Sequence, residues 1–337
     1  MNIPIKNVYY LVLYAFDQVK NKSDIVDKDF ESIKDFDEVI VDLFIKEVNK
    51  IIKKGVYRDY NTSNDELSLI KGKIKINESS LLKNGKKVCE YDDFNSINQH
   101  NEILKFIVNR LLFTKGLSKK LKSKLKTIYF TFNEIELKEF TVSDFRKVDF
   151  NKLNYNYEFP IKLASYIISN TIPSEDEGSY KFIDILKDEE QMNIIFEKFL
   201  LNFYRLNTDY RVKGSKMYSW YFNSYSDDLN SIPKMKTDIE LIKKDNKIII
   251  DAKYYTDAFT NSYNTNKHRS GHMYQINAYL DHNVGIFKNL RGILIYPTNG
   301  YNFNEKFYNE KFSIEFATVD LSLEWKDIEQ RLIDIVS

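Results

Sequence analysis

The sequence has few of the residues that mark disulfide-rich, metal-rich or irregular proteins. It contains one cysteine, Cys89, with four histidines, five prolines and ten glycines among 337 residues. A single thiol excludes an internal disulfide and a cysteine-rich zinc module, and it fits the reducing cytoplasm in which we expect the protein. The scarcity of proline and glycine argues for long regular elements instead of low-complexity linkers.

Strong net charge and long apolar runs are also missing. Lys and Arg number 50 against 49 Asp and Glu, a formal net charge of +1, which excludes a uniformly basic nucleic-acid coat and an acidic disordered chain. The apolar run from Val8 to Phe16 is too short for the roughly 20 residues of a membrane span, and no basic segment of a signal peptide precedes it. Neither G-x-x-x-x-G-K-[ST] nor G-x-G-x-x-G occurs, so any nucleotide hydrolysis is expected on another chain.

The N-terminal part mixes two periodicities. Apolar residues recur at three-and-four spacing in residues 37–54 and 101–113, which predicts two helices, and residues 117–125 predict a short basic helix continuing the second one. Between them, residues 67–76 alternate apolar and polar side chains and predict a strand. We therefore expect an α+β domain over residues 1–157.

The remaining residues, 158–337, predict a second domain, because 337 residues exceed the usual size of one compact domain. A new apolar helical pattern follows Tyr155 to Pro160, and residues 173–181 are typical of a loop. The expected helices are 188–205, 271–280 and 325–335, and the expected strands are 236–242, 247–252, 292–296 and 313–319. This order indicates an α/β domain with a central mixed sheet flanked by helices, in which the first two strands form a hairpin.

Three residues of the hairpin are typical of phosphodiester chemistry. Asp251 and Lys253 are two residues apart on a strand, so both side chains point to the same face, and pairing brings Asp238 to the same end. Two carboxylates suit Mg²⁺, which keeps several waters and takes a phosphate oxygen, while a lysine positions the attacking water. The alternative is a surface salt bridge at a strand end, worth less than about 1 kcal/mol. The D-x12-D-x-K pattern resembles the core of the PD-(D/E)XK nuclease superfamily.

Three helical residues accompany this core, and many members of that superfamily place a Glu and a Gln in the positions of Glu197 and Gln275. Glu197, on the preceding helix, is a candidate third metal ligand beside Asp238 and Asp251, although it can equally face solvent next to Lys198. Gln275 and Tyr279 are four residues apart on the following helix, and either meet the strand end or pack in the core. The candidate catalytic residues are Asp238, Asp251, Lys253, Glu197, Gln275 and Tyr279.

Two other patterns carry a weaker signal. The segment from Lys115 to Lys126 presents a lysine-rich helical face, which by default is solvated and otherwise lies along DNA phosphates or an acidic partner. His268 and His272 share a helical face, but no H-E-x-x-H motif accompanies them, so a zinc protease site is excluded.

Over nearly its whole length the chain resembles the McrC family, the nuclease subunits of McrBC-type modification-dependent restriction systems. The T-D-I…I-I-D-A-K-Y-Y segment matches the nuclease core of that family, although Lys236-Thr237 and not proline precedes Asp238. The other matching segments are Ile3 to Leu11, Tyr14-Ala15, Gly55 to Tyr60, Lys71 to Ile74, Cys89 to Phe94, Asn98, and Asn101 to Lys105.

The resemblance implies a PD-(D/E)XK endonuclease domain over 158–337 and a partner-docking domain over 1–157. It implies a Mg²⁺-dependent type IV restriction endonuclease subunit for antiviral defence, directed to double-stranded DNA with modified cytosine. It also implies an McrB-type hexameric AAA+ partner that binds GTP, whose GTPase this chain stimulates. Asp238, Asp251 and Lys253 align directly with the metal and catalytic positions of the family, whereas Glu197, Gln275 and Tyr279 are placed by their position in the fold.

Two other functions remain open from the sequence. One is a non-cutting activator of the AAA+ GTPase, and the other is a stand-alone DNA nuclease. The intact D…D-x-K pattern favours cutting over an adaptor role, and the near-neutral charge counts against an autonomous duplex binder. For contacts with the partner, Lys71 to Lys75 are the candidates.

Overall fold

The computed structural model describes residues 3–19, 33, 35–82, 85–183, 188–220, 232–254, 259–262, 265–298 and 302–337. The chain forms two compact units, one made of residues 1–36 and 184–337 and the other of residues 37–183. These boundaries differ from the expected domains 1–157 and 158–337. None of the described helices is long and apolar enough to span a membrane.

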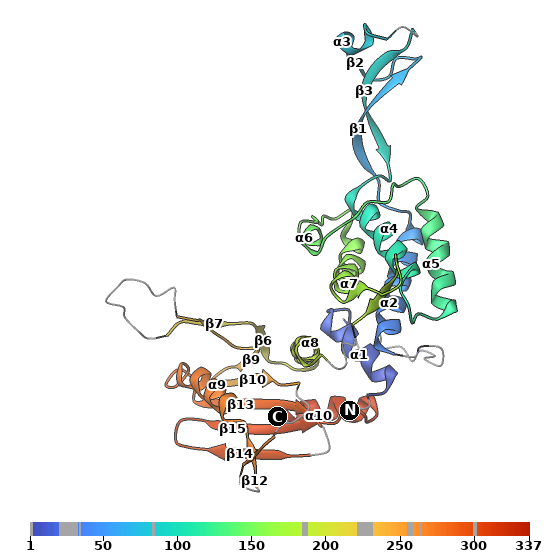
Figure 1. The fold of residues 1–337 in the computed structure, drawn as a ribbon. Coiled ribbons are helices and arrows are strands. Elements are labelled where there is room, and N and C mark those ends of the chain that lie inside the picture. Colours follow the sequence, from blue (N-terminus) through green and yellow to red (C-terminus); the bar gives the residue numbers. More distant parts are fainter. Residues whose placement is uncertain are drawn as a thin grey trace. The chain divides into compact units, whose positions relative to one another are not determined.

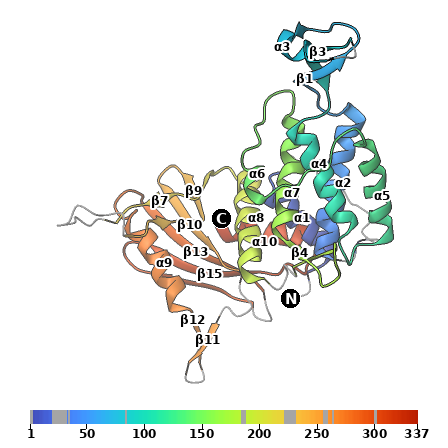
Figure 2. The ribbon, with the colours of Figure 1, turned by 45° about the horizontal axis from the view of Figure 1, so that its top comes forward.

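The unit of residues 37–183 consists of a helical body and a β-finger (Figure 2). The helices of the body are α2 (Phe36–Lys54), α4 (Gln99–Leu112), α5 (Lys119–Thr131), α6 (Val142–Phe145), the 3₁₀ helix η2 (Tyr155–Tyr157) and α7 (Glu158–Ser169). The finger comprises β1 (Asp59–Leu67), β2 (Lys73–Ile74), α3 (Ile76–Ser79) and β3 (Lys87–Asn95) in the order β1-β3-β2. A short hairpin of β4 (Thr171–Pro173) and β5 (Tyr180–Phe182) follows α7.

The two long helices expected in this unit are confirmed, but the strand expected over 67–76 is wrong. The ladder ends at Leu67, and only Lys73 and Ile74 pair again with β3. Leu69 and Ile70 are both exposed, so the alternation in the sequence does not reflect a buried face. Gly72 has φ +69°, and a Cβ there would lie 2.3 Å from the carbonyl oxygen of Glu90, so the turn needs glycine at this point.

The other unit is built around a six-stranded mixed sheet in the order β14-β15-β13-β10-β9-β6 (Figure 1). Its strands are β6 (Arg211–Gly214), β9 (Ile239–Lys243), β10 (Asn246–Ala252), β13 (Asn289–Pro297), β14 (Asn304–Tyr308) and β15 (Ser313–Val319). The central strands β10, β13 and β15 are parallel, and β14, β9 and β6 are antiparallel to their neighbours. Two short pairs accompany the sheet, β7 (Met217–Tyr218) with β8 (Met235–Lys236) and β11 (Phe259–Ser262) with β12 (Thr265–His268).

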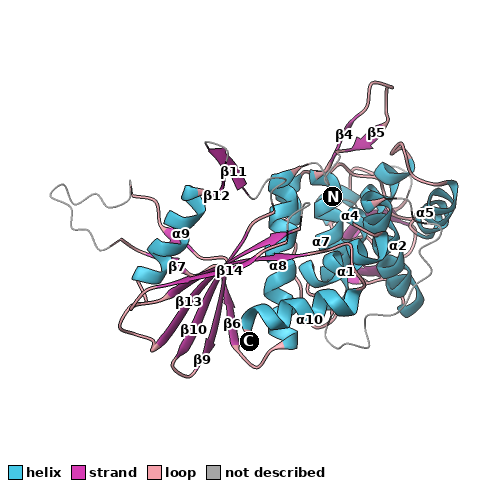
Figure 3. Ribbon diagram, turned by 90° about the horizontal axis from the view of Figure 1, so that it is seen from below, coloured by secondary structure: helices cyan, strands magenta, loops and turns pink. Residues whose placement is uncertain are grey.

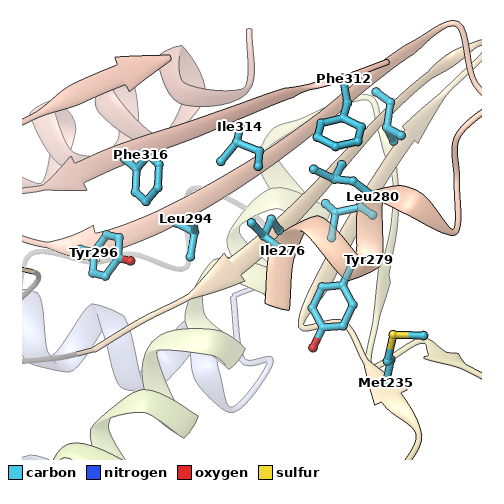
Figure 4. Packing of buried hydrophobic residues seen from close by; sticks show 11 residues of the cluster. Met235, Ile276, Tyr279, Leu280, Leu294, Tyr296, Phe312, Ile314 and Phe316 are labelled. Carbon is cyan, nitrogen blue, oxygen red and sulfur yellow. The ribbon is translucent and has the colours of Figure 1, made fainter. Parts of the chain in front are cut away.

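Helices cover both faces of this sheet. The view in Figure 3 shows α9 (Ser270–Asp281) on one side, and α8 (Glu189–Asn207) and α10 (Trp325–Val336) on the other. On the α9 side, Ile276 and Leu280 pack against Ile249, Leu294 and the aromatic residues of β13 and β15 (Figure 4). Helix α9 lies so close that a Cβ at Gly292 would be 2.8 Å from Ile276 and Leu280. The expected mixed sheet flanked by helices is therefore present.

The first helix belongs to the sheet unit and not to the unit that follows it in the chain. Helix α1 (Ile5–Ala15) packs on α8, and Tyr14 contacts Phe199 and Phe203 through its ring. Conversely, Tyr157 at the expected boundary donates a hydrogen bond of 2.7 Å to Asn101, and α7 packs on α4. These contacts explain why the compact units divide the chain at residues 36 and 184.

Candidate active site

The β9–β10 hairpin brings Asp238, Asp251 and Lys253 together at one end of the sheet. Ile239 pairs with Ile250, so the next residue of each strand is Asp238 on one side and Asp251 on the other. The amide of Ala252 donates to Asp238 Oδ2 at 3.0 Å, and Lys253 Nζ lies 2.7 Å from Asp251 Oδ2. The hairpin geometry predicted from the spacing of these residues is present.

Asp251 is completely buried. The three apolar residues that precede it, Ile248 to Ile250, are buried as well, so this part of β10 lies inside the core. The amide of Lys253 continues this strand by donating to Ile295 O at 3.0 Å. Asp251 Oδ1 accepts no hydrogen bond from any residue that the structure describes. A buried carboxylate oxygen of this kind normally has a partner, so the position favours a bound cation.

Both carboxyl groups of the hairpin have raised pKa values. Burial raises the pKa of Asp251 to about 7, the negative charge of Asp238 adds to this effect, and Lys253 opposes it. Burial also raises the pKa of Asp238, against the effects of Lys253 and of the Ala252 amide. Two desolvated carboxylates at close range destabilise each other's charge, and a divalent cation removes that repulsion.

Glu197 of α8 is half-buried and lies close enough to the hairpin for the two charges to interact. Burial raises its pKa, and the charge of Asp238 raises it further, whereas Lys236 and Lys198 lower it. Among the described residues, however, no group of three or more histidine, cysteine or acidic side chains is arranged to hold a metal ion. The site thus contains two close carboxylates, those of Asp238 and Asp251, and Glu197 interacts with Asp238 through its charge.

Gln275 and Tyr279 of α9 form a chain of hydrogen bonds with one possible direction. The carbonyl of Lys236 can only accept, so Tyr279 donates its hydroxyl proton to it at 2.6 Å. The hydroxyl oxygen then accepts from Gln275 Nε2 at 2.8 Å, which turns Gln275 Oε1 toward Lys253 Nζ at 3.1 Å. Gln275 contacts the candidate site directly, and Tyr279 contacts it through Gln275.

The two histidines singled out in the sequence have separate partners. His272 Nδ1 lies 2.9 Å from Tyr296 OH, and burial lowers the pKa of His272 to about 4 together with the charges of Lys253 and Arg269. His268 stacks on Phe316 and its Nε2 lies 2.8 Å from Glu305 Oε2. They do not form a metal-binding pair.

A second polar cluster on the same sheet face was not anticipated from the sequence. Glu240 and Lys247 are completely buried between the sheet and α9, with Lys247 Nζ 2.9 Å from Glu240 Oε2. The one signal for this pair is that Glu240 interrupts the apolar residues Ile239 and Leu241. Asn193 of α8 was also missed, and its Oδ1 accepts from the amide of Tyr254 at 2.8 Å.

Comparison with known proteins gives concordant matches. Residues 9–297 match the model of a family described as McrBC 5-methylcytosine restriction system component. The chain is 28% identical over 340 residues to the type IV methyl-directed restriction enzyme EcoKMcrBC of Escherichia coli strain K12, covering 99% of this chain and 97% of the relative. It also resembles a chain in the assembly of Thermococcus gammatolerans McrB AAA+ hexamers with bound McrC, with a TM-score of 0.63 and 17% identity over 99% of this chain and 75% of the other.

Proposed function

Because this chain belongs to the McrBC 5-methylcytosine restriction system component family, we propose that it is the McrC-type subunit that cuts DNA. In this proposal it hydrolyses phosphodiester bonds in DNA with modified cytosine, with Mg²⁺ as cofactor and an McrB-type AAA+ GTPase as partner. The sheet unit is then a nuclease domain of the PD-(D/E)XK type. The observation that carries the proposal is the convergence of Asp238, Asp251 and Lys253 at one end of the sheet.

The residues present fit a magnesium ion. The donors of the hairpin are carboxylate oxygens, which Mg²⁺ prefers, and Asp251 Oδ1 accepts no hydrogen bond from the described residues. Asp238 and Asp251 would hold the ion, and the charge of Glu197, which interacts with that of Asp238, would add to the negative field around it. When bound, Mg²⁺ supplies positive charge for the scissile phosphate and lowers the pKa of a bound water.

Lys253 supplies the second positive charge. Its ammonium group is held between Asp251 Oδ2 and Gln275 Oε1, at 2.7 and 3.1 Å, so its direction is fixed before a substrate arrives. A fixed ammonium group orients the attacking water and stabilises the negative charge that develops on the phosphate as water adds and the P–O bond breaks. Gln275 and Tyr279 contribute by holding this lysine in place.

The unit of residues 37–183 is the proposed docking region for the AAA+ partner. The distal part of its finger carries Leu69, Ile70, Ile76 and Leu81, which are 66–84% exposed. Exposed apolar residues close together mark protein-interaction sites. The candidate contact residues Lys71 to Lys75 lie in the same part of the finger, between Ile70 and α3. GTPase stimulation through this region is part of the proposal.

The test is cleavage of methylated plasmid DNA by the complex with its partner, measured beside GTP turnover. Asp251→Asn should abolish cleavage because the site loses a charge that Mg²⁺ needs. Lys253→Ala should lower the cleavage rate by about 10² or more. Both variants should leave GTPase stimulation intact, because they alter the sheet unit alone.

Asp245→Asn is the matched control, since Asp245 is an exposed aspartate at the opposite end of the same hairpin and pairs with Lys288 at 3.6 Å. It should cut at the wild-type rate. Undiminished cleavage by Asp251→Asn would refute the assigned site. If the wild-type complex stimulates GTP hydrolysis but never cuts, the chain is the non-cutting activator.

A further inference from the structure

The buried pair Glu240–Lys247 lies on the same face of the sheet as the candidate site. Glu240 is two residues after Asp238 on β9, and Lys247 is four residues before Asp251 on β10, so all four side chains point toward α9. The exposed fractions are 0% for Glu240 and 1% for Lys247. A charge pair inside a core is expensive unless its remaining hydrogen bonds are made.

Two neutral side chains supply further hydrogen bonds to this pair, and among the described residues Glu240 Oε2 has the ion pair with Lys247 alone. Lys247 Nζ donates to Tyr218 OH and to Asn283 Oδ1, both at 2.8 Å, and Tyr218 OH donates to Glu240 Oε1 at 2.5 Å. Tyr218 belongs to β7, whereas Asn283 is two residues after the last residue of α9. The four residues therefore join β7, β9, β10 and the end of α9, and we call them the buried clamp.

The buried clamp contacts the segment directly before Asp238, residues 235–237. Strand β8, which ends two residues before Asp238, pairs with β7 so that Tyr218 is opposite Met235. Thr237 is hydrogen-bonded through its backbone and through its side chain. Its amide donates to Lys216 O at 2.9 Å, and its hydroxyl donates to Glu240 Oε1 at 3.4 Å. Ser215 N donates to Asp238 O at 3.1 Å.

The clamp also connects to the other side of the site. Asn283 Nδ2 donates to the carbonyl of Tyr279 at 2.8 Å, and the hydroxyl of Tyr279 binds Lys236 O. Met235, Tyr279 and Leu280 pack together beside this segment (Figure 4). Residues 235–238 are thus held from β7, from β9 and from α9.

We propose that Glu240, Lys247, Tyr218 and Asn283 are positioning residues that fix Asp238 for metal binding. This inference rests on the proposed function. Replacing a buried ion pair by apolar residues of similar volume is often neutral or stabilising, so in this inference the pair serves the placement of its neighbours. In this inference Asp238 and Asp251 bind the metal, and the four residues act only by holding Asp238.

The experiment compares single and double apolar replacements in the full chain with its partner. Lys247→Met alone should lower the melting temperature, because it leaves Glu240 buried without its cation. The double variant Glu240→Met with Lys247→Met should recover the melting temperature. Its Mg²⁺ requirement should nevertheless rise, with a midpoint for cleavage about tenfold higher, the range found for residues that orient metal ligands.

A second readout is independent of cleavage. Mg²⁺ should raise the melting temperature of the isolated wild-type chain, since a ligand of the folded state stabilises it, and should raise that of the double variant less at the same concentration. Arg291→Met with Glu315→Met is the control, because this pair also joins two strands of the sheet, at 2.9 Å, while its further partners include Lys306 and the carbonyls of residues 335–337. The control should keep the wild-type Mg²⁺ midpoint.

Two results are decisive against the inference. If the double variant melts like the wild type and keeps its Mg²⁺ midpoint and its Mg²⁺-induced stabilisation, the clamp is only structural. If the control shifts the midpoint as much as the double variant, the effect is a general loss of sheet rigidity. Absence of any Mg²⁺ response in the wild type would instead refute the proposed function itself.

Discussion

At the scale of single residues, the environment of Asp251 strongly disfavours the charged form of its side chain. It is completely buried, its neighbour Asp238 carries the same charge, and Lys253 compensates only in part, since the pKa of Asp251 remains raised. A site that places two carboxylates together before a cation binds loses stability in the metal-free protein, and metal binding recovers it.

Asp251→Asn should therefore stabilise the metal-free protein near neutral pH while removing its response to Mg²⁺. Between the ordinary carboxyl pKa of 3.8 and about 7, the folded wild type binds more protons than the unfolded chain, so its stability falls as pH rises. The variant lacks this dependence. At pH 7.5 the melting temperature of the variant should be higher by several degrees. Each kcal/mol of added unfolding free energy corresponds to roughly 2–4 °C.

The measurement is thermal unfolding from pH 5 to pH 8, with and without Mg²⁺. Asp209→Asn is the control, because Asp209 is an exposed aspartate of the same unit that pairs with Lys243 at 2.6 Å, and its variant should melt like the wild type or slightly lower. A lower melting temperature for Asp251→Asn at pH 7.5 without metal would show that the ion pair with Lys253 outweighs burial.

At the scale of elements, the β-finger is attached to its helical body by the side-chain amides of Asn98 and Asn101, of which Asn101 is completely buried. Asn101 Nδ2 donates to Tyr57 O and to Ser96 O, both at 2.8 Å, and these residues stand just before β1 and just after β3. Asn101 Oδ1 accepts from Tyr157 OH at 2.7 Å, and that hydroxyl accepts from Tyr57 N at 2.8 Å. Asn98 Nδ2 also donates to Tyr57 O at 3.0 Å and to Ser96 O at 3.3 Å, so Asn101 makes the shorter hydrogen bonds at the two points where the strands leave the body.

Asn101→Leu should loosen the finger, because it keeps the side-chain volume but removes the shorter of the two hydrogen bonds to each carbonyl and the acceptor of the buried Tyr157 hydroxyl, at about 1–3 kcal/mol for an unsatisfied buried group. We expect weaker GTPase stimulation at a given concentration, if the finger contacts the partner. Tyr157→Phe should act in the same direction and less strongly. The measurement is partner GTP turnover against concentration of the variant.

Asn109→Leu, on the same helix α4 and farther from the finger, is the control and should stimulate like the wild type. Full stimulation by Asn101→Leu, in a protein that melts at a lower temperature, would separate the anchoring of the finger from activation of the partner.

At the scale of the whole molecule, the chain begins in the sheet unit, leaves it for residues 37–183 and returns. Residues 184–337 and α1 form one core, because α1 packs on α8. Asn7 Nδ2 donates to Leu321 O and Leu323 O, both at 2.8 Å, and Tyr10 packs on Trp325 with ring centroids 4.8 Å apart. The first helix is thus joined to residues more than 300 positions away.

A fragment of residues 184–337 should therefore fold poorly, whereas residues 37–183 should fold alone. The first fragment exposes the side chains of α8 and α10 that α1 covers, and the second retains its own core. Adding a peptide of residues 1–36 to the first fragment should restore a cooperative melt by circular dichroism. A cooperative melt of residues 184–337 at the same temperature without the peptide would contradict this.

Local spacing alone determined the features that depend on neighbours in the chain. The helices α2, α8 and α10 follow apolar residues at three-and-four spacing, and a hairpin with a two-residue turn places Asp238 opposite Asp251 once its register is set. The D-x12-D-x-K site was therefore readable from the sequence as a geometric cluster. Its chemical role is a proposal that rests on that cluster and on the family.

Only the tertiary structure decided features that join distant residues. The alternation in residues 67–76 predicted a strand, but no core lies under Leu69 and Ile70, so the chain turns there. Tyr218 and Lys247 are 29 residues apart, and Asn101 and Tyr157 are 56 apart. No local period links such positions, because packing of whole elements brings them together. Membership of α1 in the sheet unit depends on the same long-range packing.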